Sequence, residues 1–308
     1  MIAFVFPGQG AQRVGMGREL YESVPAARAV YEAANEALGF DIAALCFDGP
    51  QDELTLTSNA QPAILATSIA CLRALQEATE GLPTPAYVAG HSLGEYSALV
   101  CAEALTLSEA VRLVRKRGEF MAEAKEGTMA AVLGLAPEKV VEACDSASDA
   151  GVVVPANFND PGQVVISGER AAVEMACARA SELGAKRAVP LPVSGAFHSP
   201  LMADAAQRLA AELQSADIAD PRVPVVANVD AEPKTDAEAV RAALCAQVTS
   251  SVRWQQSVER IVDAGGETFV EIGPGTVLSA MIRRISPGAS VLNVGDSASL
   301  ARTADALS

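Results

Sequence analysis

Short apolar runs that stop at glycine, proline or asparagine recur along this chain of 308 residues. Between them lie segments whose apolar residues repeat with the period of a helix, for example residues 16–38, 60–78 and 107–124. Buried strands that alternate with helices predict a mainly parallel sheet with helices on both faces, an α/β fold. We interpret five runs as strands of this sheet: IAFVF (2–6), AYVA (86–89), VPVVA (223–227), TFVEI (268–272) and SVLNV (290–294).

Residues 127–190 follow a different pattern. Four apolar runs and two helical segments occur in the order β-α-β-β-α-β, which is the split βαβ or ferredoxin-like arrangement. The strands are TMAAVLGL, GVVVPA, GQVVISG and AKRAVPL, and the helices are APEKVVEACDSA and ERAAVEMACARASELG. We therefore expect a small ferredoxin-like domain, residues 126–195, inserted into a large domain made of residues 1–125 and 196–308.

Composition excludes several classes of partner and cofactor. The formal net charge of −15 argues against nucleic acid or an anionic membrane as the main partner. The six cysteines include no C-x-x-C pair, so we expect reduced thiols in a cytoplasmic protein, with no metal and no cofactor. The apolar start of the chain has no basic residue before it, and no apolar run approaches the length of a membrane span.

The stretch GHSLG places Ser92 between Gly90 and Gly94, after an expected strand and before an expected helix. One interpretation is a helix N-cap, with Glu95 completing a capping box. The other is the nucleophile elbow G-x-S-x-G, in which a strained turn presents the serine hydroxyl above a sheet. The strand and helix that flank this motif favour the elbow.

A serine hydroxyl is a poor nucleophile unless a neighbouring group takes its proton. The chain has two histidines, His91 and His198. His91 adjoins Ser92, so its side chain leaves the backbone in another direction, and we expect it to have a packing role. His198 is therefore the candidate base, held by an acidic residue or by a backbone carbonyl. The amides of Leu93 and Gln9 are the candidate oxyanion donors.

Arg117 lies at the edge of the apolar stripe of the helix predicted over 107–124, whereas Arg112, Arg115 and Lys116 lie outside it. A guanidinium beside the core needs an anion. That anion is either an acidic side chain in a structural ion pair or the carboxylate of a substrate, and the sequence leaves both open.

Eight motifs along the chain, including the one around Ser92, form a pattern that is more specific than any of them alone. In order they are FVFPGQGAQRVGMG, LTLTSNAQPAILATS, GHSLGEYSALV, RLVRKRGEFM, NFNDPGQVVISG, GAFHSPLM, VRWQQSV and EIGPG. Together they resemble the malonyl-CoA:acyl carrier protein transacylases, of the acyltransferase family that also includes polyketide synthase acyltransferase domains. The resemblance runs from near residue 3 to near residue 295.

The resemblance implies Ser92 as the acylated residue, His198 as its base and Arg117 as the ligand of the malonyl carboxylate. It also implies an oxyanion hole from the amides of Gln9 and Leu93. The main chain of Gln247 would orient the histidine. The implied fold is a large α/β-hydrolase-like domain with a ferredoxin-like one. The implied partners are malonyl-CoA and acyl carrier protein, in a ping-pong cycle through a malonyl-serine that supplies fatty acid biosynthesis.

The chain departs from the family pattern at three places. Glu103 stands where the family usually has glycine, Ser251 stands where proline is common, and the link near residues 122–130 is shorter than usual. None of these is a matched catalytic position. The motif GAFHS is similar to the malonyl-selective pattern, in which Phe197 would crowd a methyl-branched substrate.

Three other functions are weighed against this one. A stand-alone acyltransferase of a polyketide pathway would use the same residues. A serine esterase or thioesterase would share the elbow, but Arg117 and the missing third acid argue against it. A non-catalytic role, as a scaffold or in binding a carrier protein, is disfavoured because Ser92, His198 and Arg117 are all present.

Docking of an acidic carrier protein on an acidic chain requires a local basic patch. The candidates are Lys186 and Arg187 in the small domain, and Arg283 and Arg284 after the EIGPG motif.

Overall fold

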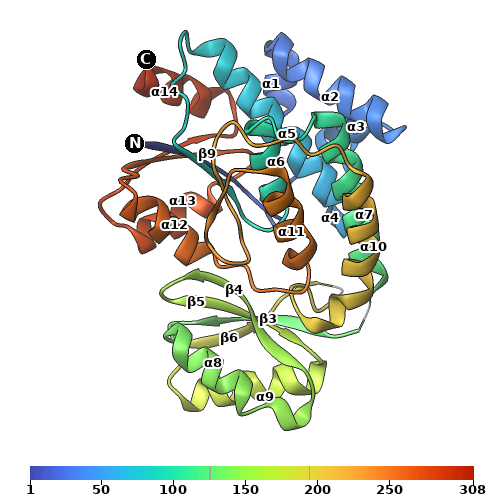
Figure 1. Ribbon diagram of the computed structural model, residues 1–308, viewed down its shortest axis with the longest axis vertical. Helices are drawn as coiled ribbons and strands as arrows, with labels where there is room; N and C mark the ends of the chain where they lie inside the picture. Colours follow the sequence, from blue (N-terminus) through green and yellow to red (C-terminus); the bar gives the residue numbers. More distant parts are fainter. Residues whose placement is uncertain (125, 194) are drawn as a thin grey trace.

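The larger part of the molecule is built on a mostly parallel sheet of six strands (Figure 1). This computed structural model describes residues 1–124, 126–193 and 195–308. The strand order is β10-β9-β1-β2-β7-β8, and only the last pair is antiparallel. The strands are β1 (Ile2–Phe6), β2 (Tyr87–Gly90), β7 (Val225–Val226), β8 (Pro233–Lys234), β9 (Thr268–Ile272) and β10 (Ser290–Val294). The predicted parallel sheet is confirmed, although the run at 223–227 forms only a two-residue strand.

Helices bury both faces of this sheet. Phe4 and Phe6 of β1 pack on one side with α5, whereas Ala3 and Val5 pack on the other with α12 and α13. Successive side chains of a strand point to opposite faces of the sheet, so a strand that is buried on both faces is apolar at every position. The helices of this part are α1 (Arg18–Ser23), α2 (Pro25–Leu38), α3 (Ile42–Asp48), α4 (Gln51–Thr55), α5 (Thr57–Ala78), α6 (Gly94–Cys101), α7 (Leu107–Glu123), α10 (Ala203–Ser215), α11 (Ala237–Gln247), α12 (Trp254–Asp263), α13 (Val277–Ile285) and α14 (Ser297–Leu307).

The helical segment predicted over 16–38 is divided into α1 and α2. Val24 has an extended backbone, with φ −120° and ψ 111°, and Pro25 begins the second helix. A residue before proline is disfavoured in the helical region, and proline fits the first position of a helix. The break between the two helices therefore follows from Pro25, which the pattern of apolar residues does not take into account.

The smaller part contains a four-stranded antiparallel sheet of order β4-β5-β3-β6. Its helices lie on the face turned away from the larger part (Figure 1). The predicted order β-α-β-β-α-β is confirmed. The elements are β3 (Thr128–Leu133), α8 (Pro137–Asp145), β4 (Val153–Asp160), β5 (Gln163–Gly168), α9 (Arg170–Glu182) and β6 (Arg187–Pro190). A short 3₁₀ turn, η1 (Ser148–Ala150), lies between α8 and β4, and a second, η2 (Pro200–Met202), precedes α10 in the larger part.

The two sheets are joined by backbone hydrogen bonds as well as by the chain. Val252, which precedes α12, donates its amide to Ala156 O at 2.8 Å and accepts from the amide of Phe158 at 2.9 Å. Met129, Ala131 and Val165 of the smaller sheet pack with the core of the larger part. The inner face of the smaller sheet is therefore held over the carboxyl-terminal edge of the larger one.

Candidate active site

Ser92 lies in the turn between β2 and α6, at the carboxyl end of a central strand. Its φ is +51°, a left-handed conformation that a non-glycine residue adopts only at a cost in free energy. Leu93 occupies the N-cap position of α6 with no side-chain cap, so the capping-box interpretation is wrong. The turn has the strained strand-to-helix geometry of a nucleophile elbow.

The flanking glycines are required by close backbone contacts. A Cβ at Gly90 would lie 1.9 Å from the carbonyl carbon of Gly94, and a Cβ at Gly94 would lie 2.1 Å from the carbonyl oxygen of Phe6. Neither contact involves a side chain that could move away. Gly90 and Gly94 therefore let α6 start directly above β1 and β2, which brings Ser92 to the edge of the sheet.

His198 reaches Ser92 from a segment 106 residues further along the chain. Its Nε2 lies 2.7 Å from Ser92 Oγ, and its Nδ1 lies 3.0 Å from Gln247 O and 3.2 Å from Ser250 O. Carbonyl oxygens only accept, so Nδ1 carries the proton and Nε2 presents its lone pair to the hydroxyl. Burial, together with the charge of Arg117, lowers the pKa of His198 to about 3. The imidazole is thus neutral and able to accept a proton.

His91 lies apart from this pair, as its neighbouring position suggested. Its Nε2 is 2.9 Å from Asn159 Oδ1, and its ring centroid is 5.9 Å from that of Trp254. Burial lowers the pKa of His91, so this side chain is also neutral. These contacts fit the packing role expected for it.

Arg117 is 1% exposed and points to Ser92. Its Nη2 donates to Ser92 Oγ and to Gln247 Oε1, both at 3.0 Å, and its Nη1 donates to Gln61 Oε1 at 2.7 Å. Among the described residues no carboxylate lies within 4.0 Å of this guanidinium, and its Nε has no acceptor. Within that part of the chain, the structural ion pair considered for Arg117 is absent.

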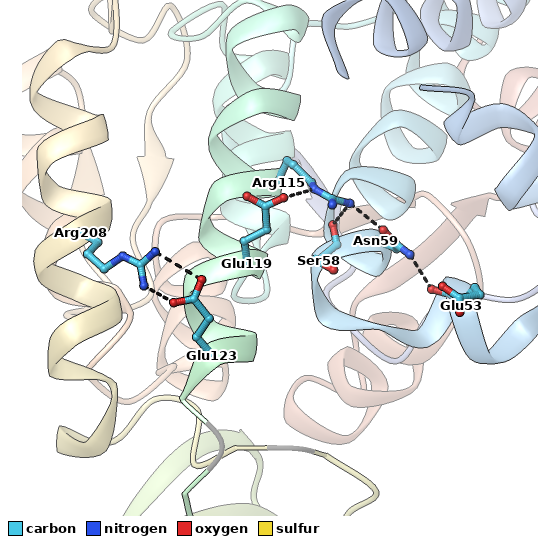
Figure 2. A network of polar contacts seen from close by, with 7 residues as sticks. All are labelled: Glu53, Ser58, Asn59, Arg115, Glu119, Glu123 and Arg208. Carbon is cyan, nitrogen blue, oxygen red and sulfur yellow. Dashed lines mark hydrogen bonds and ion pairs between the residues drawn. The ribbon is translucent and has the colours of Figure 1, made fainter. Parts of the chain in front are cut away.

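Other charged side chains of α7 form ion pairs at its surface (Figure 2). Arg115 pairs with Glu119 at 2.6 Å and donates to Ser58 O and to Asn59 on α5. Glu123, at the end of α7, pairs with Arg208 of α10. These pairs fix α7 against its neighbours. The other basic residues of α7 have partners at its surface, and only Arg117 is buried and directed inward.

Three buried polar residues around the elbow were not predicted as site residues. Asn228 accepts from the Ser92 amide at 2.7 Å through Oδ1 and donates to Gly90 O at 2.7 Å through Nδ2. Glu95 accepts from the Asn228 amide at 3.0 Å, and Gln61 binds Arg117. The available signal was position: Asn228 follows a strand, and Gln61 lies in one of the motifs quoted above.

Ser92, His198 and Arg117 face a cleft of about 330 Å³. Gln9 and Leu93 line it from the larger part, and Met129 and Leu191 line it from the smaller part. The amides of Gln9 and Leu93 have no hydrogen-bond acceptor among residues 1–124, 126–193 and 195–308. The cleft therefore contains a serine hydroxyl, a neutral imidazole, a buried cation and two unused amide donors.

Two of the departures from the family pattern, Glu103 and Ser251, are not among the residues that line this cleft. Glu103 follows α6 with φ +59° and pairs with Arg222 at 3.1 Å. Ser251 donates to Pro155 O at 2.6 Å, which adds a hydrogen bond between the two parts. The short link near residues 122–130 includes Lys125, which lies outside the described residues.

The four docking candidates differ in their contacts. Lys186 and Arg187 are exposed at the start of β6. Arg283 donates to Val291 O at 3.2 Å, and Arg284 pairs with Asp160 of β4 at 2.7 Å. Asp160 is buried, so this ion pair gives Arg284 a structural role. The sequence did not reveal this partner.

Neither a membrane-spanning helix nor a metal-binding cluster occurs among the described residues. No helix there is long and apolar enough to cross a membrane. No group of three or more histidine, cysteine or acidic residues is placed to hold a metal ion in that same part of the chain.

Comparison with known proteins agrees with the resemblance in the motifs. Residues 3–302 match the family described as acyl transferase domain. The malonyl CoA-acyl carrier protein transacylase of Bacillus subtilis (strain 168) is 49% identical over 299 residues, covering 96% of this chain and 93% of that protein.

Solved structures of similar proteins share the fold. The malonyl CoA-acyl carrier protein transacylase of Coxiella burnetii has a TM-score of 0.96 and 41% identity, covering 99% of this chain and 97% of that one. A malonyl-transacylase in complex with a type II PKS acyl-carrier protein has a TM-score of 0.95 and 44% identity, with 99% of both chains covered. Cleft, fold and sequence agree, and the chain belongs to the acyl transferase domain family, among the malonyl CoA-acyl carrier protein transacylases.

Proposed function

We propose that this protein transfers the malonyl group from malonyl-CoA to the phosphopantetheine thiol of acyl carrier protein. The observation that carries the proposal is the contact of one hydroxyl with two groups. Ser92 Oγ lies 2.7 Å from His198 Nε2 and 3.0 Å from Arg117 Nη2. A base and a cation thus meet at the same nucleophile, as transfer of an anionic acyl group requires.

The first half-reaction is acylation of Ser92. His198 Nε2 takes the hydroxyl proton as Oγ attacks the thioester carbonyl of malonyl-CoA. The tetrahedral intermediate collapses, the carbon–sulfur bond breaks, and His198 returns the proton to the CoA sulfur. The carbonyls of Gln247 and Ser250 hold the imidazole in its tautomer, as the acid of a triad does, and stabilise the imidazolium while it exists.

The amides of Gln9 and Leu93 form the proposed oxyanion hole. Both line the cleft, and Leu93 stands at the amino end of α6, where the helix dipole also favours negative charge. The exposure of Gln9 at the mouth of the cleft leaves its amide accessible to substrate.

The second half-reaction reverses the first with a different thiol. After CoA leaves, the phosphopantetheine thiol gives its proton to His198 Nε2 and attacks the malonyl-serine ester. The ester bond breaks, and Ser92 Oγ recovers the proton. One site therefore serves both thiols in turn, which is the basis of the ping-pong cycle.

Arg117 is proposed to bind the malonyl carboxylate. It is buried, it lines the cleft, and its Nε lacks an acceptor within the described chain. A buried donor without a partner accommodates an anionic ligand at a small further desolvation cost. Phe197, which is 6% exposed, lines the same cleft and is proposed to crowd a methyl-branched substrate.

We propose fatty acid biosynthesis as the pathway supplied. A polyketide pathway is the second candidate, because one similar structure is a complex with a type II PKS acyl-carrier protein. The transfer rates to purified carrier proteins of the two kinds, compared at equal concentration, distinguish the pathways. A serine esterase is less well supported, because Arg117 provides a site for an anionic acyl group that a simple ester lacks.

We also propose the finer organisation predicted from the sequence. Residues 1–125 and 196–308 form an α/β-hydrolase-like domain, a classification supported by the elbow at the end of β2. Residues 126–195 form a ferredoxin-like domain, supported by the separate core of α8, α9 and their sheet. A cytoplasmic location is proposed because the described cysteines are free, and burial raises the thiol pKa of Cys46 and Cys71.

Intact mass measurement after mixing with malonyl-CoA tests the mechanism. The wild-type protein should gain one malonyl group. Ser92→Ala should gain none, and His198→Ala should acylate slower by about two orders of magnitude or more, because an unassisted hydroxyl attacks thioesters poorly. A complete malonyl adduct on Ser92→Ala would contradict the assignment. Acetyl-CoA and methylmalonyl-CoA, offered singly, report the acyl selectivity.

A further inference from the structure

The structure contains a buried carboxylate beneath the elbow that the proposed reaction does not use. Glu95, in the first turn of α6, is 3% exposed and lies in the part of the molecule that holds Ser92 and Arg117. We propose that Glu95 is a positioning residue, which fixes the side-chain amide of Gln247 and through it the guanidinium of Arg117. This inference rests on the proposed function, since it concerns how the malonyl carboxylate is recognised.

One oxygen of Glu95 is committed to two donors. Glu95 Oε2 accepts from the backbone amide of Asn228 at 3.0 Å and from Gln247 Nε2 at 2.9 Å. The amide of Asn228 can only donate, so Oε2 remains an acceptor whether or not the carboxyl carries a proton, because that proton would occupy the other oxygen. Burial raises the pKa of Glu95 to about 7, and the contact holds on either side of that value.

This acceptor determines which way the Gln247 amide faces. Gln247 Nε2 uses its two protons on Glu95 Oε2 and on Ser92 O, the latter at 3.0 Å. Gln247 Oε1 is then directed at Arg117 Nη2, at 3.0 Å. The reversed amide would set its nitrogen against a guanidinium that only donates. A fixed acceptor on one side and a fixed donor on the other therefore leave a single orientation.

The orientation of Gln247 in turn limits where Arg117 can lie. Nη2 of Arg117 divides its protons between Gln247 Oε1 and Ser92 Oγ, and Nη1 binds Gln61 Oε1. Both terminal nitrogens are thus positioned by neutral acceptors, and no carboxylate within the described chain competes with the malonyl carboxylate for Arg117. Glu95 acts on Arg117 only through Gln247. Its negative charge therefore stays away from the position proposed for the malonyl carboxylate.

The test measures acylation by malonyl-CoA and by acetyl-CoA and compares their ratio of kcat/KM. Glu95→Ala removes one of the two acceptors of Gln247 Nε2 and leaves only Ser92 O, so the Gln247 side chain is held less firmly against Arg117. The malonyl-to-acetyl ratio should fall by about tenfold, the size expected for one lost hydrogen bond to a charged group. Glu95→Gln keeps a carbonyl oxygen that can accept from both donors, and it should stay within about threefold of the wild-type ratio.

Glu271 provides the matched control. It is also fully buried, and it accepts the backbone amides of Leu278 and Ser279 at the start of α13. Glu271→Ala should lower the melting temperature and leave the ratio unchanged. A folded Glu95→Ala protein with the wild-type ratio overturns the proposal, and so does a Glu95→Gln protein whose ratio falls as far as that of Glu95→Ala.

If Glu95→Ala does not fold, Glu95→Asp takes its place. The shorter side chain keeps the charge but withdraws the acceptor, so the ratio should again fall, and an unchanged ratio would overturn the inference. The wild-type protein is measured first. If it forms no malonyl adduct, the proposed function itself fails, whatever the variants of Glu95 do.

Discussion

Both residues proposed to react are held in backbone conformations that their side chains disfavour. Ser92 has φ +51° and His198 has φ +57°. Left-handed backbone costs a non-glycine residue about 1–3 kcal/mol, so each must be maintained by its surroundings. Asn228 clamps the Ser92 amide, and two carbonyls hold the imidazole. These contacts offset the cost of both conformations and keep Ser92 Oγ and His198 Nε2 at 2.7 Å from each other.

Arg117→Ala tests carboxylate recognition. If Arg117 binds the malonyl carboxylate, kcat/KM for malonyl-CoA should fall by about 30- to 4,000-fold, which corresponds to 2–5 kcal/mol for a truncated buried charge pair. Acetyl transfer should hold steady or improve, because acetyl-CoA has no carboxylate. Arg117→Lys should rescue only partly, since a point charge cannot replace the planar fork. An unchanged ratio with a large loss of melting temperature would assign Arg117 to the scaffold.

The pH dependence of acylation tests the state of His198. Burial holds the pKa of His198 at about 3, well below the ordinary histidine value, so the imidazole stays neutral as the pH falls through 6.5. We expect the rate of malonyl-serine formation to be flat between about pH 4.5 and 6, below the pKa of about 7 for Glu95. Single-turnover mass measurement gives this rate. A decline centred near pH 6.5 would mean an unburied, ordinary base.

At the scale of elements, α6 ends in a conformation that suits glycine better than the residue present. Glu103 has φ +59° just past the helix, the position where a left-handed glycine commonly ends helices. Its ion pair with Arg222 is exposed and contributes about 0–1 kcal/mol. The left-handed backbone at Glu103 therefore carries a cost in stability.

Glu103→Gly should relieve that cost. The free energy of unfolding, measured by denaturant titration, should rise by about 0.5–1 kcal/mol, because glycine adopts this backbone without steric strain. Glu103→Ala is the control, since alanine loses the same ion pair but keeps the strain, and it should give no gain. A Gly variant no more stable than the Ala variant would show that the conformation costs little here. Acylation of Ser92 should be unaffected in both.

At the scale of the whole molecule, the cleft exists because a second sheet is held over the first. Met129 and Leu191 close the side opposite Gln9 and Leu93. The backbone hydrogen bonds of Val252 and the side-chain hydrogen bond of Ser251 connect the two parts. Substrate access thus depends on two parts that each have a core of their own.

The basic patch on the smaller part can be tested separately from the chemistry. The double change Lys186→Glu and Arg187→Glu should raise the apparent KM for acyl carrier protein and leave acylation by malonyl-CoA unchanged. The double change Lys139→Glu and Arg170→Glu, at exposed positions of α8 and α9, is the charge-matched control and should change neither. Arg284 is unsuitable for reversal, because a glutamate there would face the buried Asp160. Unchanged carrier kinetics in the double variant would exclude this patch.

The sequence alone was sufficient for five strands of the larger sheet and the β-α-β-β-α-β order of the smaller part, and it singled out Ser92 and Arg117 as candidate site residues. The apolar run of residues 2–6, the glycines around Ser92 and the place of Arg117 at the edge of the apolar stripe are local properties, so they can be read from neighbouring residues. The break at Pro25 was equally local, but the apolar period concealed it.

Tertiary structure decided how those residues meet. His198 is 106 residues from Ser92, and the pairing depends on the return of the chain from the smaller part. The network of Glu95, Asn228 and Gln247 joins positions up to 152 residues apart. Its members carry no pattern of their own, because a buried polar side chain is defined by the partners that folding brings to it. The sequence therefore determined which chemistry was possible, and the packing of two sheets determined its geometry.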